Sequence, residues 1–412
     1  MNREIQAVGL DIGTSKIRCV IGEPSEDGKM NIIGIGQAES RGLRRGIVTT
    51  TDAVAASIKK AVEEAERISG LEIHSATINL SGEHLRGENK SGVVAVAGAG
   101  REISSEDVER AVESASAMQL PAGWEIVDRL PQEFIIDGQD GIVEPIGMRG
   151  ARLESRIHVI SSPSAGKQNV VKAIHQAELE IESMMLEPLA AAHSTLSDDD
   201  MEYGCALVNI GEELTSMMIF GRGAVQHTTV FPFGGMHFTK DIAVGLRVSI
   251  PEAERIKHSY GCVAGFLMSE EEKQSVIEVT PVGRQETRQL SKEILCDIMQ
   301  PRAVELLQHI AHEVFANRGQ ISSGVVLTGG GVLSRGMVEI AEQVFDAPTR
   351  LGFLETKHFG GLLDEVQSPE WAVAAGLALS SVRSQIRRHS AGGKSPSRKV
   401  AEWFENFREK FR

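Results

Sequence analysis

Aromatic residues and cysteines are both scarce in this sequence. Aromatic side chains make up 4% of the 412 residues, so the hydrophobic core must be built mostly from Val, Ile, Leu and Ala. The cysteines lie far apart, and no pair has the spacing of metal ligands. Three of them lie in apolar segments, which is typical of structural thiols in a reducing compartment. The four positions are Cys19, Cys205, Cys262 and Cys296.

Long hydrophobic runs are missing as well. No segment approaches the roughly 20 apolar residues that cross a bilayer, and the N-terminus has no apolar stretch typical of a signal peptide. We therefore expect any contact with a membrane to be peripheral. Because 41% of the residues are hydrophobic and the chain is long, the sequence predicts two or more well-packed domains.

Charge is distributed unevenly along the chain. The net charge is −14, but the segment from Arg383 onward carries nine basic and three acidic residues, which leaves −20 on the remainder. Because the chain before Arg383 is strongly acidic, nucleic acid is disfavoured as a partner. The basic tail indicates an acidic partner, and we expect this to be an anionic membrane surface.

Near the N-terminus, two short apolar strands flank a tight polar turn. Gly13 lets the backbone approach a ligand closely, and Thr14, Ser15 and Lys16 then offer backbone N–H groups, hydroxyls and an ammonium. Such a set of donors suits a phosphate chain. Asp11, at the end of the first strand, can hold a divalent cation through water. An ordinary β-hairpin is the alternative, because short glycine motifs often match by chance.

The same plan recurs later in the chain. Residues 206–220 again form a strand, a turn and a strand, about one domain's length downstream. Residues 324–333 form a buried strand that runs into Gly329, Gly330 and Gly331, where a flat base can lie against bare backbone. Two such hairpins and one glycine loop, in this order, resemble the actin-fold nucleotide-binding superfamily.

Other stretches resemble FtsA, the bacterial cell-division branch of that superfamily. They are Leu-Pro-Gln-Glu at 130–133, Pro-Ile-Gly at 145–147, and Pro-Arg-x-x-Glu at 301–305. The resemblance runs from Ile5 to Arg412. It implies an α/β protein with the actin/hexokinase/heat-shock-ATPase-type fold of two duplicated halves, with an inserted small α+β subdomain and a C-terminal amphipathic helix.

The same resemblance implies a division into subdomains. The expected parts are subdomain 1A (1–81 and 160–202), the inserted subdomain 1C (82–159), subdomain 2A (203–240 and 320–382), subdomain 2B (241–319), a flexible linker (383–397) and a membrane-targeting helix (398–412).

The implied cofactors are ATP and Mg²⁺, and Asp11 is the residue expected to bind the metal. Glu254 and Lys257 lie three residues apart on one face of an expected helix, and the resemblance implies that they bracket the ribose. A surface ion pair is the alternative for these two. The implied cofactor-binding residues are Asp11, Gly13, Thr14, Ser15, Lys16, Gly211, Gly235, Glu254, Lys257, Gly329, Gly330 and Gly331.

The second hairpin departs from the family pattern of an aspartate followed by a glycine-rich turn. Asn209 removes a carboxylate that would orient metal and water, and Glu212 and Glu213 add acidic groups where phosphates approach. These two glutamates either point away from the ligand or are offset by a cation. We expect retained nucleotide binding with little or no hydrolysis, so the chain is at most a weak ATPase and no catalytic residue is assigned.

The resemblance also implies protein partners. The Pro301 helix is expected to lie on the subdomain that receives the C-terminal tail of FtsZ, the bacterial tubulin homologue, and Arg302 and Glu305 are the expected contacts. Self-association into filaments and contacts with later division proteins are implied as well.

The last fifteen residues predict an amphipathic helix. Its apolar side chains recur at helical spacing and form one stripe, flanked by basic residues, as in interfacial membrane helices. A terminal helix packed on the protein's own core is the alternative. The stripe consists of Val400, Trp403, Phe404, Phe407 and Phe411, with Arg408 and Lys410 on the polar flank.

These features favour a scaffold that anchors the FtsZ ring to the cytoplasmic face of the cell membrane at the division site. Two alternatives are a pilus-assembly-type actin homologue and a small-molecule kinase, because one fold supports several functions. A kinase requires a base aimed at a substrate hydroxyl, and no carboxylate in the sequence has a clear claim to that role.

Overall fold

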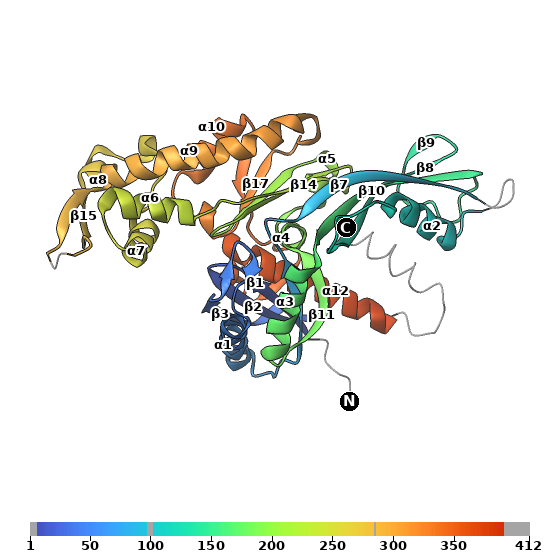
Figure 1. Ribbon diagram of the computed structural model, residues 1–412, viewed down its shortest axis with the longest axis horizontal. Coiled ribbons are helices and arrows are strands. Elements are labelled where there is room, and N and C mark those ends of the chain that lie inside the picture. Colours follow the sequence, from blue (N-terminus) through green and yellow to red (C-terminus); the bar gives the residue numbers. More distant parts are fainter. Residues whose placement is uncertain (1–5, 97–101, 284–285, 391–412) are drawn as a thin grey trace.

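The computed structural model describes residues 6–96, 102–283 and 286–390. It contains two halves, each built around a central sheet (Figure 1). In the first sheet the strand order is β11-β6-β1-β2-β3-β19, and β1 pairs antiparallel with β2 and parallel with β6. The strands are β1 (Ala7–Ile12), β2 (Lys16–Pro24), β3 (Met30–Glu39), β6 (Ser75–Leu80), β11 (Glu180–Leu186) and β19 (Phe359–Gly361).

The second half repeats this arrangement. Its strand order is β14-β13-β12-β17-β18, and β12 pairs antiparallel with β13 and parallel with β17. Strands β1 and β12 are buried along their whole length, as apolar strands covered on both faces must be. The two duplicated halves expected from the sequence are confirmed. The strands are β12 (Ala206–Ile210), β13 (Thr215–Gly221), β14 (Ala224–Phe231), β17 (Val325–Thr328) and β18 (Thr349–Leu351).

Helix α1 (Thr51–Ser69) covers one face of the first sheet. Its buried side chains recur at helical spacing and include Val54, Ile58 and Ala61, so one apolar stripe faces the strands. Gly70, with φ of +73°, ends the helix in the left-handed conformation that glycine adopts without strain. The spacing of the apolar residues and the position of Gly70 account for both the apolar face and this end.

Helices α4 (Glu187–Thr195) and α12 (Ala372–Ser390) cross where the halves meet. A Cβ added to Gly376 would lie 1.7 Å from the Ala190 carbonyl oxygen, so only glycine allows this backbone contact. Likewise, a Cβ on Gly9 of β1 would lie 2.1 Å from a backbone oxygen of α12. Small residues thus let α12 pack directly on both α4 and the first sheet.

The flexible linker expected over 383–397 is wrong for its first part, because α12 continues to Ser390. Its polar side chains find partners on the first half. The Gln385 amide donates to the backbone oxygen of Gln6 at 2.8 Å. Tertiary contacts therefore extend a helix through a stretch that has the composition of a linker. Residues 391–397 lie outside the described residues.

An inserted sheet with the order β7-β10-β8-β9 projects from one end of the molecule, opposite the helical end of the second half (Figure 1). Its base is tied to β14: the Asn89 amide donates to the Gln226 oxygen at 3.0 Å, and the Gln132 amide donates to the Val225 oxygen at 2.8 Å. The elements are β7 (Arg86–Ala95), α2 (Ser105–Ser116), β8 (Trp124–Ile136), β9 (Gln139–Ile142) and β10 (Arg152–Pro163).

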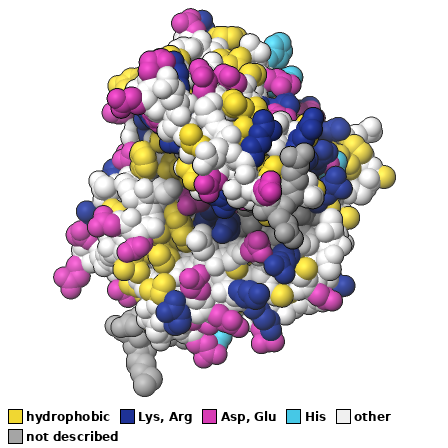
Figure 2. All heavy atoms as spheres, turned by 90° about the vertical axis from the view of Figure 1, so that its left-hand side faces the viewer, with side chains coloured by type: hydrophobic (Ala, Val, Ile, Leu, Met, Phe, Trp, Pro, Cys, Tyr) yellow, Lys and Arg dark blue, Asp and Glu magenta, His cyan; other side chains and the backbone are white. Residues whose placement is uncertain are grey.

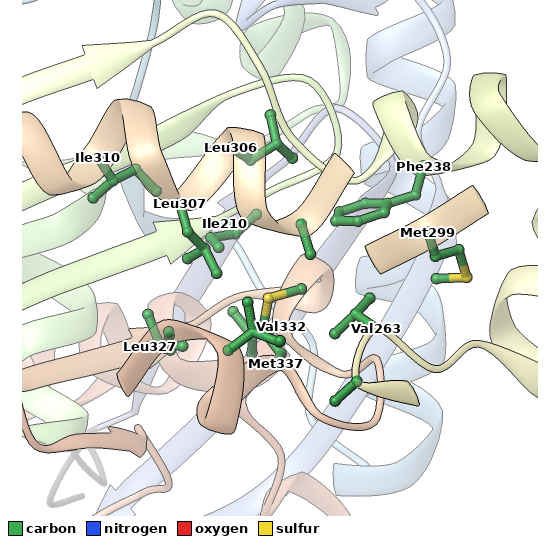
Figure 3. Packing of buried hydrophobic residues seen from close by; sticks show 14 of the residues in the cluster. Ile210, Phe238, Val263, Met299, Leu306, Leu307, Ile310, Leu327, Val332 and Met337 are labelled. Carbon is green, nitrogen blue, oxygen red and sulfur yellow. The ribbon is translucent and has the colours of Figure 1, made fainter. Parts of the chain in front are cut away.

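The second half carries additional helices that share its largest hydrophobic core. Figure 3 shows Phe238, Met299 and Leu307 packed with Val332 and Met337, which follow the glycine loop. This core holds the glycine loop rigidly against the helices. The helices are α6 (Met236–Leu246), α7 (Ile250–Tyr260), α8 (Glu270–Gln274), α9 (Lys292–Ala316) and α10 (Met337–Phe345), and a hairpin is formed by β15 (Val276–Val279) and β16 (Arg288–Ser291).

Short elements complete the described chain. None of its helices is long and apolar enough to cross a bilayer. The remaining elements are β4 (Leu43–Arg44), β5 (Ile47–Val48), α3 (Ser164–Gln176), α5 (Asp198–Tyr203), α11 (Leu363–Val366) and the 3-10 helices η1 (Gly265–Leu267), η2 (Arg318–Gln320), η3 (Gly330–Val332) and η4 (Pro369–Trp371).

Candidate functional site

The first hairpin places a buried carboxylate at the edge of its sheet. Asp11 accepts a hydrogen bond from the Asn79 amide at 2.8 Å, and the Asn79 carbonyl accepts the backbone N–H of Ile12 at 2.8 Å. A Cβ on Gly13 would lie 2.8 Å from the Lys16 oxygen, so the turn is too tight for another residue. Close approach, rather than a positive φ, explains this glycine.

The second hairpin is supported by a glycine pair that packs on its turn. The N–H of Gly211 donates to the Leu214 oxygen at 2.9 Å and closes the turn. The N–H of Gly235 then donates to the Gly211 oxygen at 2.8 Å. A Cβ on Gly234 would lie 2.4 Å from that same oxygen. The glycine pair therefore fixes the turn against the start of α6.

The triple-glycine loop leaves its middle residue open. Gly329 has φ of +86°, and a Cβ there would lie 2.3 Å from the Asn209 side chain. Gly331 is also crowded, with 2.5 Å to the nearest side-chain atom. A Cβ on Gly330, in contrast, would meet nothing closer than the Glu370 carboxylate at 4.0 Å. The outer glycines are required by packing, whereas the middle one faces open space.

These three segments converge on one cleft between the halves, with an empty volume of about 940 Å³. Figure 2 shows a recess between the two halves, with basic side chains inside it. All twelve residues expected to bind the cofactor line this cleft: Asp11, Gly13, Thr14, Ser15, Lys16, Gly211, Gly235, Glu254, Lys257, Gly329, Gly330 and Gly331.

The sequence analysis missed further polar residues of the cleft, among them Asn79, Glu187, Arg18 and Glu370. Asn79 is the second-last residue of β6 and Glu187 directly follows β11, so both lie at the end of a strand. That position was the available signal for these two. Arg18 and Glu370 also line the cleft, and their side chains form an ion pair. They are 352 residues apart, so no local pattern indicates the contact.

Two carboxylates share the inner end of the cleft. Burial, reinforced by the nearby Glu187 carboxylate, raises the pKa of Asp11 to about 7, although Arg18 acts in the opposite direction. Burial also raises the pKa of Glu187, against hydrogen bonds from Asn209 and Ser216. Neighbouring buried carboxylates repel each other when both are ionised. This end of the cleft is therefore prepared to receive a cation.

Glu254 and Lys257 form the pair expected at the other end. The Lys257 ammonium lies 2.8 Å from a Glu254 oxygen and donates to the Thr239 hydroxyl at 2.9 Å. Burial alone would raise the pKa of Glu254, but hydrogen bonds from His258, Lys257 and Thr239 lower it to about 2. Glu254 is therefore an anion at neutral pH, and it orients the lysine at the rim of the cleft.

The two glutamates of the second turn face different ways. Glu213 accepts the backbone N–H of Arg45 at 2.7 Å and so bridges to the first half, away from the cleft. Glu212 lines the cleft, where burial raises its pKa while Lys257 lowers it. Of the two alternatives from the sequence, Glu213 points away from a ligand, and Glu212 is partly offset by a cation.

The donor set fits a nucleotide with a hard divalent cation. Threonine and serine hydroxyls, two lysines and bare glycine backbone surround the cleft, and Asp11 and Glu187 offer the oxygen ligands that Mg²⁺ prefers. Within the described ranges, no three His, Cys, Asp or Glu side chains could hold a metal by themselves. Mg²⁺ is usually held by one or two carboxylates, waters and substrate phosphates.

The residues expected to contact FtsZ do not line the cleft. Arg302 on α9 makes a two-pronged ion pair with Asp241 of α6, at 2.5 and 3.1 Å, and also contacts Glu305 at 2.6 Å. Its charge is thus already shared within the chain. The stripe of Val400, Trp403, Phe404, Phe407 and Phe411, with Arg408 and Lys410, lies outside the described residues.

Two duplicated α/β halves around a cleft define an actin-like fold, and solved structures agree. The chain superposes on the "PilM-PilN type IV pilus biogenesis complex" with a TM-score of 0.67 and 19% identity, covering 91% of this chain and 98% of that one. MreB5 of Spiroplasma citri bound to ADP gives a TM-score of 0.55 and 12% identity, with 94% and 99% covered. At such identities the likeness shows the fold alone.

Sequence comparison identifies the family. A family model described as "Cell division protein FtsA" matches residues 206–376, and one described as "SHS2 domain inserted in FTSA" matches residues 82–161. The chain is 38% identical over 380 residues to the cell division protein FtsA of Pseudomonas aeruginosa, covering 92% of this chain and 89% of the relative. It is 37% identical to FtsA of Neisseria meningitidis, with 96% and 97% covered. The chain therefore belongs to the FtsA family of bacterial cell division proteins.

Proposed function

We propose that this protein is an ATP-binding, actin-like scaffold of cell division that polymerises, binds the C-terminal tail of FtsZ and anchors the division ring to the cytoplasmic membrane. A single observation supports the nucleotide site most strongly. Twelve residues from five separate segments of the chain line one cleft between the halves. MreB5 structures with ADP and with AMPPNP have the same fold, which supports nucleotide binding by a chain of this fold.

In this proposal ATP lies between the halves, with its phosphates at the two hairpins and its base against the triple-glycine loop. Asp11 and Glu187 would hold Mg²⁺, which neutralises phosphate charge. Lys257, oriented by Glu254, would contact the ribose end. Because Asn209 stands where the resemblance implies an aspartate, we propose slow hydrolysis or none.

The remaining parts of the proposal concern assembly. Arg302 and Glu305 on α9 would contact the C-terminal tail of FtsZ, and the aromatic stripe around Trp403 would insert into the membrane interface. One such helix binds reversibly, but a filament that carries many of them binds firmly because the later contacts are effectively intramolecular.

Filling the cleft tests the nucleotide site. Gly330→Leu places a side chain in open space toward the cleft, so it should fold normally and lose ATP binding measured by calorimetry with Mg²⁺. Gly166→Leu is the matched control, because a Cβ there also meets nothing within 4 Å but lies outside the cleft. Equal ATP affinity in both variants would show that the nucleotide binds elsewhere.

The scaffold function is tested by electron microscopy of filaments on a lipid monolayer, with and without ATP. Filaments should form on anionic lipid, recruit FtsZ and be lost from a variant that lacks residues 398–412. Absence of any assembly on the lipid under both conditions would contradict the proposal.

A further inference from the structure

Arg18 lies at the inner end of the cleft, and one N–H group of its guanidinium has no hydrogen-bond acceptor among the described residues. It stands directly opposite Asp11 in the antiparallel pairing of β1 and β2, so both side chains are on one face of the sheet. Only 10% of the Arg18 side chain is exposed, yet its Nε–H has no hydrogen-bond partner among the described residues. A buried donor without an acceptor is costly, and a ligand in the cleft would supply the acceptor.

Glu370 occupies one side of this guanidinium. A terminal nitrogen of Arg18 pairs with a Glu370 oxygen, and the centre of the guanidinium lies 5.5 Å from the centroid of the Trp371 ring. Glu370 is 29% exposed on its side chain, which faces the open position beside Gly330. Its carboxylate is thus an anion at a place that a phosphate oxygen could otherwise take.

The short helix that carries Glu370 belongs to both the cleft and α12. The Pro369 oxygen accepts the N–H of Gly329 at 3.1 Å, which ties η4 to the glycine loop. Helix α12 begins at Ala372, immediately after η4. If Glu370 changes its partner, η4 can therefore shift the start of α12, the helix that packs against both halves.

The position of Arg18 along the cleft indicates which phosphate it would meet. The Glu254 and Lys257 pair lies at the ribose end in the proposed arrangement, whereas Asp11 and Glu187 lie at the cation end. A divalent cation bridges the terminal phosphates of a bound triphosphate. Arg18, opposite Asp11, therefore lies beside the last phosphate rather than the first.

We propose that Arg18 binds the terminal phosphate of a nucleotide and that, without this phosphate, it stays paired with Glu370. A nucleoside triphosphate draws the guanidinium away from Glu370, whereas a diphosphate leaves the Arg18–Glu370 pair intact. The cleft thereby distinguishes tri- from diphosphate, and the bidentate geometry of arginine suits this exchange between two anions. The inference rests on the proposed nucleotide site.

Calorimetry with AMPPNP and with ADP, each with Mg²⁺, tests the exchange. Glu370→Gln removes the competing charge, so AMPPNP should bind at least fivefold more tightly while ADP affinity changes less than twofold. The double variant Arg18→Gln with Glu370→Gln removes both charges of the pair, so neither is left unpaired. Relative to Glu370→Gln alone, its affinity for AMPPNP should fall at least tenfold, whereas its affinity for ADP should change less than threefold. Lys257→Gln is the matched control at the other end and should weaken both nucleotides equally.

Fluorescence gives a second readout that leaves Arg18 and Glu370 unaltered. The chain has three tryptophans, so Trp124→Phe and Trp403→Phe leave Trp371 as the single reporter. AMPPNP should change its emission as the guanidinium leaves the ring, and ADP should not.

The outcomes separate the two proposals. If both nucleotides bind but the Arg18 and Glu370 variants change them equally, or if Trp371 responds to both alike, Arg18 has a structural role and this inference is wrong. If neither nucleotide binds the parent protein, the proposed function itself is wrong.

Discussion

The side-chain amide of Asn209 donates a hydrogen bond to the buried carboxylate of Glu187. The Ser216 hydroxyl donates to the same Glu187 oxygen at 3.0 Å, and the Asn209 carbonyl accepts from the Thr328 hydroxyl at 3.3 Å. The second hairpin therefore replaces the carboxylate implied by the family pattern with a neutral donor. That donor stabilises a carboxylate supplied by the first residue of α4.

Asn209→Asp should make stability depend strongly on pH. The new carboxylate would face Glu187 in a buried site, so one of the two pKa values would rise. A raised carboxyl pKa means that stability is lost as pH increases above the ordinary value of the unfolded chain. We expect the melting temperature of this variant, relative to the parent, to fall from pH 6 to pH 8 and to recover with Mg²⁺.

Ser216→Ala is the control, because it removes a donor to Glu187 without adding charge. It should cost about 1 kcal/mol at both pH values. The same Asn209→Asp protein should hydrolyse ATP faster than the parent, measured as phosphate release. Brisk hydrolysis by the parent protein would contradict the interpretation of Asn209.

Asp11→Asn should stabilise the protein without ligand while weakening the cation site. Because burial raises the pKa of Asp11 to about 7, the folded state holds this proton more tightly than the unfolded chain. The contribution of Asp11 to stability thus declines as pH rises from its ordinary value toward 7. At pH 8 the variant should melt a few degrees higher than the parent but lose the Mg²⁺ dependence of ATP affinity.

Asp199→Asn, at an exposed aspartate, is the matched control and should change neither property. An Asp11→Asn protein that melts lower than the parent at pH 8, yet keeps full Mg²⁺ dependence, would exclude Asp11 from the cation site.

Arg302→Glu should weaken binding of an FtsZ tail peptide, measured by fluorescence anisotropy. Loss of one charge-assisted contact is worth about 1.5–3 kcal/mol, or roughly ten- to hundredfold in affinity. The structure adds a cost, because the substitution also places like charge beside Asp241 and Glu305. The melting temperature should therefore fall slightly as well.

A charge swap separates the two effects. Arg302→Asp with Asp241→Arg restores an ion pair within the chain but moves the positive charge from α9 to α6. This protein should regain the parent's melting temperature without regaining peptide affinity. Full peptide binding by either variant would remove Arg302 from the partner site.

Trp403→Glu should release the protein from anionic vesicles in a sedimentation assay. The stripe that contains Trp403 could contribute several kcal/mol of burial, and a charge in its middle opposes insertion. The thermal melt should stay unchanged if the segment does not pack on the folded body. A variant that melts several degrees lower and still sediments with vesicles would favour a core helix.

Glu402→Gln is a suitable control because it lies next to Trp403 but outside the apolar stripe. It should bind vesicles at least as well as the parent, since it removes a negative charge near an anionic surface.

The sequence by itself determined the local structural features of this protein, such as its turns, its helix ends and the apolar faces of its helices. The tight turn at Gly13, the end of α1 at Gly70 and the apolar face of α1 each follow from steric limits and spacing within a few residues. The repeat of strand, turn and strand indicated two similar halves. Such features are readable because their physical cause lies within one short segment.

Only the tertiary structure decided which side chains meet across the chain. Glu187 reaches Asn209, Arg18 pairs with Glu370, and α12 extends beyond residue 383, because the packing of the halves brings distant segments together. The composition of residues 383–390 suggested a linker, but contacts with the first half hold these residues in a helix. Burial of Asp11 beside Glu187, which sets its unusual pKa, likewise depends on strand β1 and the start of α4, which no local pattern connects.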